Sequence, residues 1–162
     1  MSSYRKAVLA MLLFLISSFC QAAEESSHGE HGDAEYHKNR VAGFIGITGE
    51  DRRDRALTLG VDYSRRLSPS FAIGIGIERA FGDLEFTVLT IPAAYYFNDG
   101  WKVFAGPGWE NADDQDETEF LVRAGIEYEF EMDGYEIAPV LMFDFIDGEV
   151  VVIGGVALAW GF

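Results

Sequence analysis

The chain has 162 residues and a formal net charge of −15, from 27 acidic and 12 basic residues. A surface this acidic excludes nucleic acid as a natural partner. The length suits one domain behind a short leader, and the single cysteine, Cys20, leaves no pair for a disulfide framework.

Residues 1–22 have the pattern of a secretory signal peptide. Arg5 and Lys6 form a basic start, residues 7–19 are almost entirely apolar, and small residues follow Cys20. The apolar run falls short of the roughly 18–20 residues that a membrane-spanning helix needs. Phe19 stands where a lipoprotein signal has a small residue, so lipidation of Cys20 is not expected. The leader carries two bases and no acid, so its removal would take the formal charge from −15 to −17.

Residues 23–39 are polar, lack an apolar period and predict a flexible tail. This tail contains every histidine of the chain: His28, His31 and His37. Imidazole and carboxylate groups suit Zn²⁺, Cu²⁺ or Ni²⁺, so a divalent metal is one predicted partner. The spacing matches no rigid site, and a solvated tail without metal is the other interpretation.

Eight segments of alternating polarity follow the tail. They predict strands over residues 40–48, 55–67, 70–81, 84–97, 100–110, 118–132, 135–146 and 149–162. Asn98-Asp99-Gly100, Asp133-Gly134 and Asp147-Gly148 are strong hairpin signals. No segment has a helical period, so the simplest topology is a run of up-and-down antiparallel strands.

The last predicted strand separates large from small side chains. One face carries Val150, Val152, Val156, Leu158, Trp160 and Phe162, and the other carries mostly Gly155, Ala157, Ala159 and Gly161. Most of the other strands alternate in the same way, although residues 40–48 and 84–97 are ambiguous. Bulky apolar residues outside and small residues inside predict a barrel in lipid. A soluble, lipocalin-like barrel would have the reverse arrangement.

Aromatic residues gather where the predicted strands should meet the two membrane interfaces. One end collects Phe71, Tyr95, Phe97, Trp101, Tyr128, Phe130, Tyr135, Trp160 and Phe162, and the other collects Phe81, Trp109, Phe120, Phe143 and Phe145. Two aromatic girdles around an aliphatic band are typical of an outer-membrane barrel. The predicted fold class is therefore an all-β, eight-stranded antiparallel transmembrane β-barrel over residues 40–162, with both termini periplasmic.

Two motifs strengthen this prediction. Residues 91–97 followed by 104–108, and the terminal residues 156–162, resemble the small eight-stranded outer-membrane β-barrel proteins. The resemblance implies that Trp160 and Phe162 belong to a signal for the barrel-assembly machinery. It implies little about activity, because that group includes adhesins, lipid-modifying enzymes and small-solute channels.

Charged residues on the predicted inner faces form the main candidate site. They are Asp62, Arg66, Glu78, Lys102, Glu110, Arg123, Glu127, Glu136 and Asp144. An eight-stranded barrel is only just filled by side chains, so these charges must pair. A salt-bridged core that plugs the barrel is one interpretation, and a narrow cation or proton path is the other.

Arg52, Arg53 and Arg55 lie in a predicted outer loop, where arginine forks could bind lipopolysaccharide phosphates. No histidine falls in a predicted strand, and no nucleophile motif or cofactor motif occurs. We therefore expect a porin-like, non-enzymatic structural protein of the outer membrane, without a cofactor, that contacts lipid and lipopolysaccharide. A narrow channel, or a metal-binding tail on a membrane anchor, are the alternatives.

Overall fold

The computed structural model describes residues 37–49, 55–82, 85–97, 100–112 and 118–162. The predicted signal peptide, His28, His31, Arg52 and Arg53 lie outside these ranges. Within them, no helix is long and apolar enough to cross a membrane.

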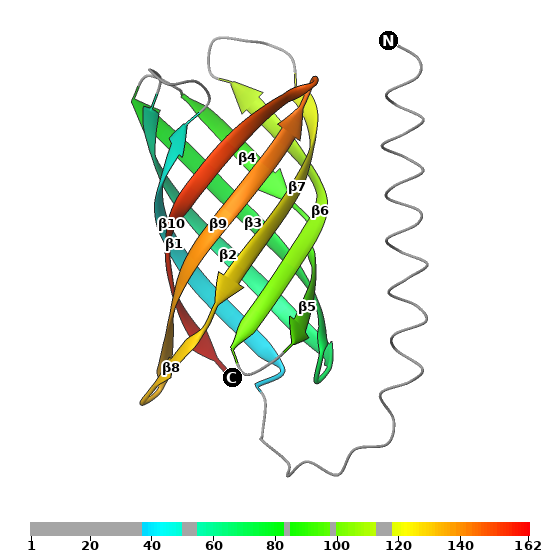
Figure 1. Ribbon diagram of the computed structural model, residues 1–162, viewed down its shortest axis with the longest axis vertical. Helices are drawn as coiled ribbons and strands as arrows, with labels where there is room; N and C mark the ends of the chain where they lie inside the picture. Colours follow the sequence, from blue (N-terminus) through cyan, green and yellow to red (C-terminus); the bar gives the residue numbers. More distant parts are fainter. Residues whose placement is uncertain (1–36, 50–54, 83–84, 98–99, 113–117) are drawn as a thin grey trace. The chain divides into compact units, whose positions relative to one another are not determined.

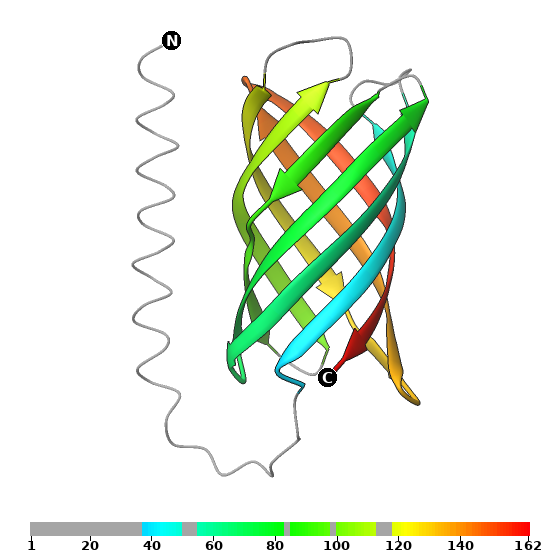
Figure 2. The same ribbon diagram turned by 180° about the vertical axis from the view of Figure 1, so that it is seen from behind.

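Ten strand segments make eight passes across one antiparallel sheet (Figures 1 and 2). Their bounds are β1 Asn39–Gly49, β2 Arg55–Ser68, β3 Phe71–Gly82, β4 Phe86–Thr90, β5 Ala93–Phe97, β6 Trp101–Ala112, β7 Thr118–Tyr128, β8 Phe130–Met132, β9 Tyr135–Ile146 and β10 Glu149–Gly161. The predicted eight antiparallel strands are confirmed.

Two of the predicted strands are interrupted. The strand expected over residues 84–97 breaks at Ile91 and Pro92, because proline has no N–H for the ladder. The Pro92 carbonyl still accepts a hydrogen bond from the Gly74 N–H at 2.9 Å, so the wall stays continuous. The strand expected over residues 118–132 breaks at Glu129, whose N–H donates to the Gly100 carbonyl at 2.7 Å.

The sheet closes on itself where β10 pairs with β1, in a register that joins Arg40 to Gly161 and Gly49 to Val152. Asn39 and Phe162 exchange two backbone hydrogen bonds of 2.9 Å at the end of this seam. We call the end with this contact the terminal end. The opposite end, where β1 leads to β2 and β9 leads to β10, is the loop end. There Asp147 and Gly148 both have positive φ, as a two-residue I′ hairpin turn requires.

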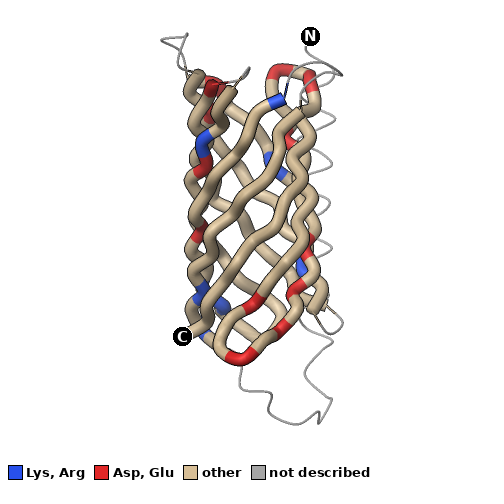
Figure 3. Tube along the Cα trace, turned by 90° about the vertical axis from the view of Figure 1, so that its left-hand side faces the viewer, with Lys and Arg blue, Asp and Glu red and all other residues tan. Residues whose placement is uncertain are grey.

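The outer face of the barrel is apolar. Large apolar side chains that keep 37% to 64% of their surface exposed include Ile45, Ile47, Leu57, Leu59, Val61, Ile73, Ile75, Ile77, Leu141, Val156, Leu158 and Phe162. A soluble protein rarely exposes so continuous an apolar patch. Figure 3 shows few charged residues between the two ends on the strands that face the viewer. The predicted alternation of β10 is present, with Val150, Val152 and Trp160 also exposed.

Aromatic rings on the outer face contact one another near both ends of the barrel. Toward the terminal end, Tyr128 packs edge-on against Trp101 and Phe130, with centroid separations of 4.9 Å and 4.7 Å. Toward the loop end, Trp109 packs against Phe120 at 6.2 Å. These contacts lie where a membrane-spanning barrel has its interfacial girdles.

Candidate functional site

The interior of the barrel contains a group of three charged side chains, which we call the central triad. The Arg123 guanidinium donates to both Asp144 carboxylate oxygens, at 2.7 Å and 2.6 Å, from the neighbouring strand. Its third nitrogen donates at 2.5 Å to Glu78, which comes from β3 on the far side of the lumen. Arg123 and Asp144 are almost completely buried. The triad therefore connects opposite walls with charge-assisted hydrogen bonds.

A second group of charges, the terminal-end cluster, lies nearer the seam contact. It consists of Arg40, Arg66, Lys102, Glu127, Glu129 and Glu136. Arg40 donates to Glu127 at 2.5 Å and to Glu136 at 2.8 Å, and Lys102 lies 2.7 Å from the other Glu127 oxygen. Glu129 has three longer ion-pair contacts, of 3.5 Å to 3.7 Å. Arg66 also stacks on the Tyr96 ring, 3.7 Å from its centroid.

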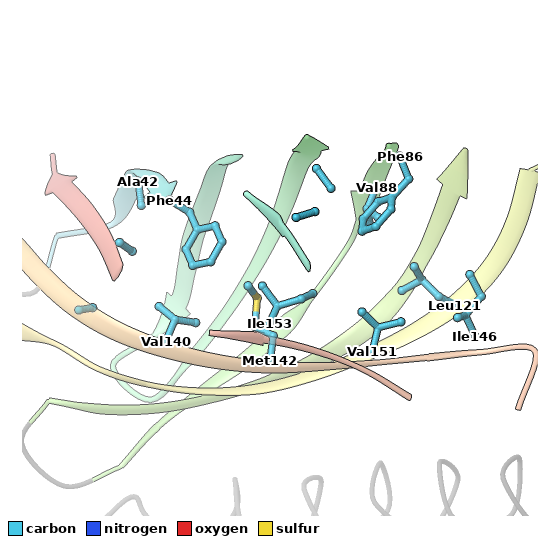
Figure 4. Close-up of a cluster of buried hydrophobic side chains, with 14 of the residues drawn as sticks. Ala42, Phe44, Phe86, Val88, Leu121, Val140, Met142, Ile146, Val151 and Ile153 are labelled. Atoms are coloured by element: carbon cyan, nitrogen blue, oxygen red, sulfur yellow. The ribbon is translucent and has the colours of Figure 1, made fainter. Parts of the chain in front are cut away.

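Beyond the central triad, toward the loop end, most of the buried side chains are apolar. On the inner face of β7, Leu121 is the next residue after Arg123 toward the loop end. Ile146 has the same place relative to Asp144 on β9. We call the following six side chains the apolar layer: Phe86, Val88, Leu121, Ile146, Val151 and Ile153. None of them exposes more than 8% of its surface. In Figure 4, Phe86, Val88 and Leu121 point into the space that the strands enclose. Thr48 and Thr58, both fully buried, satisfy each other with a hydroxyl hydrogen bond of 2.5 Å. These six apolar side chains belong to one buried cluster on the loop-end side of the triad.

The structure brings together eight residues that the sequence marked as interior charges. Arg123, Glu78 and Asp144 form the triad, while Arg66, Lys102, Glu127 and Glu136 enter the terminal-end cluster. Asp62 lies between the two groups and reaches Arg40 at 3.6 Å. Glu110 is partly buried near the loop end, where it lies opposite Val88 of β4. All of these pairs use bases and acids from different strands.

The other marked residues do not join this site. Arg55 is exposed at the start of β2, at the loop end, and His37 lies against Gly161 at the terminal end. Trp160 faces outward, and Phe162 is exposed beside its backbone contact with Asn39. No group of three or more His, Cys, Asp or Glu side chains suited to a metal ion occurs in the described ranges.

Arg40 and Glu129 are members of the site that were not among the predicted interior charges. Arg40 lies near the start of β1, which has apolar residues on both faces: Ala42 and Phe44 point inward, and Ile45 and Ile47 point outward. The inward face of this strand could have been identified from Arg40 and Thr48, the polar residues near its two ends. Glu129 shares parity with Arg123 and Glu127, and this was the available signal.

Comparisons with solved structures give the same architecture. The N-terminal β-barrel domain of Pseudomonas aeruginosa OprF matches with a TM-score of 0.59 and 14% identity, over 79% of this chain and all of that one. A de novo designed transmembrane β-barrel matches at 0.53 and 14%, over 79% and 99%. Neisserial surface protein A matches at 0.52 and 7%, over 76% and 96%.

The chain has the fold of the small eight-stranded outer-membrane β-barrels. No protein-family model and no curated protein sequence matches it. At these identities, the outer-membrane barrel fold is what the neighbours share with this chain.

Proposed function

We propose that this protein is a non-enzymatic, structural component of the bacterial outer membrane whose barrel is closed to ions and solutes. The observation that carries the proposal is that two buried groups of side chains lie in series along the lumen. The apolar layer excludes water, and the central triad joins opposite walls with three hydrogen bonds of 2.5 Å to 2.7 Å. A solute would have to disrupt both the apolar layer and the central triad. Separating a buried base from its carboxylates is costly, so passage is opposed.

Single-channel recording of the purified protein in planar lipid bilayers tests this function. We expect no current steps from the wild-type protein, whose folded state is first verified by heat-modifiable migration on gels. A Leu121→Ala, Ile153→Ala variant removes bulk from the apolar layer and serves as the comparison. Reproducible steps from the wild-type protein would contradict the closed barrel and favour a narrow channel.

We also propose that the terminal end faces the periplasm and that the loop end lies in the lipopolysaccharide leaflet. Two arginines on the outer face support this orientation. Arg55 is exposed at the start of β2. On the neighbouring strand, Arg79 donates a 3.0 Å hydrogen bond to Thr87 and lies 5.6 Å from the Phe81 ring. Arginine forks at this depth suit the phosphates of lipopolysaccharide.

A further inference from the structure

A cavity of about 70 Å³ lies inside the barrel, between the central triad and the terminal-end cluster. Arg123 and Glu78 of the triad reach one side of it, and Lys102 and Glu127 of the cluster reach the other. One water needs roughly 10–15 Å³ of such space, so the cavity has room for several waters or for a small ion with its water.

Two polar groups at the cavity lack close partners in the structure. Asp62 faces inward, yet its side chain keeps 37% of its surface accessible, and its ion-pair contact with Arg40 is long, at 3.6 Å. The Tyr96 hydroxyl, which also lines the cavity, is buried and has no hydrogen-bond partner among the described residues. A buried hydroxyl without a partner indicates a water or ion that the protein atoms alone do not supply.

The charges around the cavity do not balance. Between the apolar layer and the terminal end, the inward-facing acids are Asp62, Glu78, Glu127, Glu129, Glu136 and Asp144, and the inward-facing bases are Arg40, Arg66, Lys102 and Arg123. Six acids against four bases leave two carboxylates in excess. An uncompensated charge in a protein interior is very costly, so a cation in the lumen would stabilise the fold.

Three side chains that carry oxygen atoms border the space that two glycines leave open. A Cβ added at Gly76 would lie 3.1 Å from the Thr90 hydroxyl and 3.5 Å from the Asp62 Cβ, so both side chains border the volume that this glycine leaves empty. Ser64 borders Gly74 in the same way, with its Cβ at 3.3 Å. The cavity is thus lined by a carboxylate and two hydroxyl groups, which are ligands that hard cations prefer.

We propose that this cavity binds one small monovalent cation, such as Na⁺, with the Asp62 carboxylate as its charged ligand. Ser64, Thr90 and a water held by the Tyr96 hydroxyl complete the oxygen shell. Of the bases nearby, Arg123 is bonded to Glu78 and Asp144, and Lys102 to Glu127, so the 3.6 Å contact with Arg40 is the ion pair that the structure gives Asp62. Because a single carboxylate is the only charged ligand proposed, the site suits a monovalent ion rather than a divalent one. The site is independent of whether the barrel conducts.

The ion would enter from the terminal end. Ser64 and Arg66 on β2 remain partly exposed on the inner wall, whereas Ala56 and Thr58, nearer the loop end of the same wall, expose 3% or less. The cavity is therefore a blind vestibule that stops at the apolar layer.

Thermal unfolding of the refolded protein tests the proposal. Midpoints are measured by heat-modifiable migration in NaCl and in choline chloride of equal concentration, since choline is too large for the cavity. A ligand that binds only the folded state raises the midpoint, here by roughly 3–6 °C when Na⁺ exceeds its dissociation constant tenfold. The Asp62→Asn variant should lose this difference. Glu149→Gln removes the same charge from an exposed residue at the loop end and should keep it.

Crystals of the wild-type protein grown with Rb⁺ or Tl⁺ give a second measurement that needs no variant. The expected result is an anomalous peak beside the Asp62 carboxylate. Equal wild-type midpoints in sodium and choline would overturn the proposal. A sodium effect that persists in Asp62→Asn, or crystals without the peak, would overturn it as well.

Discussion

Arg123 illustrates how a single residue organises this interior. Its side chain exposes almost no surface, and all three guanidinium nitrogens donate to carboxylates. The planar fork suits this role because it binds two oxygens of Asp144 at once and still reaches Glu78. Arg123 contributes to stability less through its attraction to the two carboxylates than because Asp144 and Glu78 would be buried without a partner if it were removed.

Replacement of Arg123 by methionine should therefore destabilise the barrel by about 3–5 kcal/mol, since Asp144 and Glu78 would remain buried and charged without a partner. Equilibrium unfolding in urea, followed by tryptophan fluorescence, measures this change. Arg65→Met removes the same group from an exposed position on β2 and should have little effect.

A triple variant, Arg123→Met with Asp144→Asn and Glu78→Gln, should recover much of the lost stability. If the single variant is as stable as the wild-type protein, the triad does not hold the walls together.

The inward charges on most strands were predictable because polar and apolar residues alternate there with period two. The pairing was not, since Arg40 and Glu127 come from strands that are distant in sequence and meet only across the lumen. The apolar layer was also missed. Val88, Val151 and Ile153 are large and apolar like the lipid-facing residues, and only their positions in the alternation place them inside. Phe86 lies on a strand whose alternation is ambiguous.

At the scale of the strand, β10 has the clearest division between its two faces. Val150, Val156 and Trp160 point outward, while Ala157 and Ala159 are buried against the interior. The sequence predicted this strand well because its side chains differ strongly in size. It predicted the strands over residues 84–97 and 118–132 less well, because the break at Pro92 and the break at Glu129 depend on hydrogen bonds to other strands.

Position along β10 should determine the cost of a charge on its outer face. Val156 pairs with Ile45 and Pro139 in the middle of the strand, whereas Val150 lies near the loop end. Arginine at a bilayer midplane costs about 2–4 kcal/mol and near an interface about 0–1 kcal/mol. We expect Val156→Arg to be destabilised by the larger amount and Val150→Arg by the smaller.

Equilibrium unfolding in lipid vesicles distinguishes the two variants of this matched pair. Equal destabilisation would mean that Val156 and Val150 meet the same surroundings, and the outer face would then not span a bilayer.

At the scale of the whole molecule, the two ends should differ in what they bind. Lipopolysaccharide added to the refolded protein should shift its migration on native gels, because Arg55 and Arg79 face outward at the loop end. The Arg55→Gln, Arg79→Gln variant should lose most of this shift. Arg65→Gln changes an outward arginine at the opposite end and should retain it. A shift that depends on Arg65 instead would reverse the proposed orientation.

The seam between β1 and β10 also limits how fast the chain can fold. Asn39 and Phe162 are separated by 123 positions, whereas the other strands pair with neighbours along the chain. Contacts between distant residues form slowly, because a long loop must close before they gain any stabilisation. Until that closure, the nascent sheet has two unpaired edges of the kind that drive aggregation. Encounter of the two edge strands is therefore the step that a folding catalyst would gain most by accelerating.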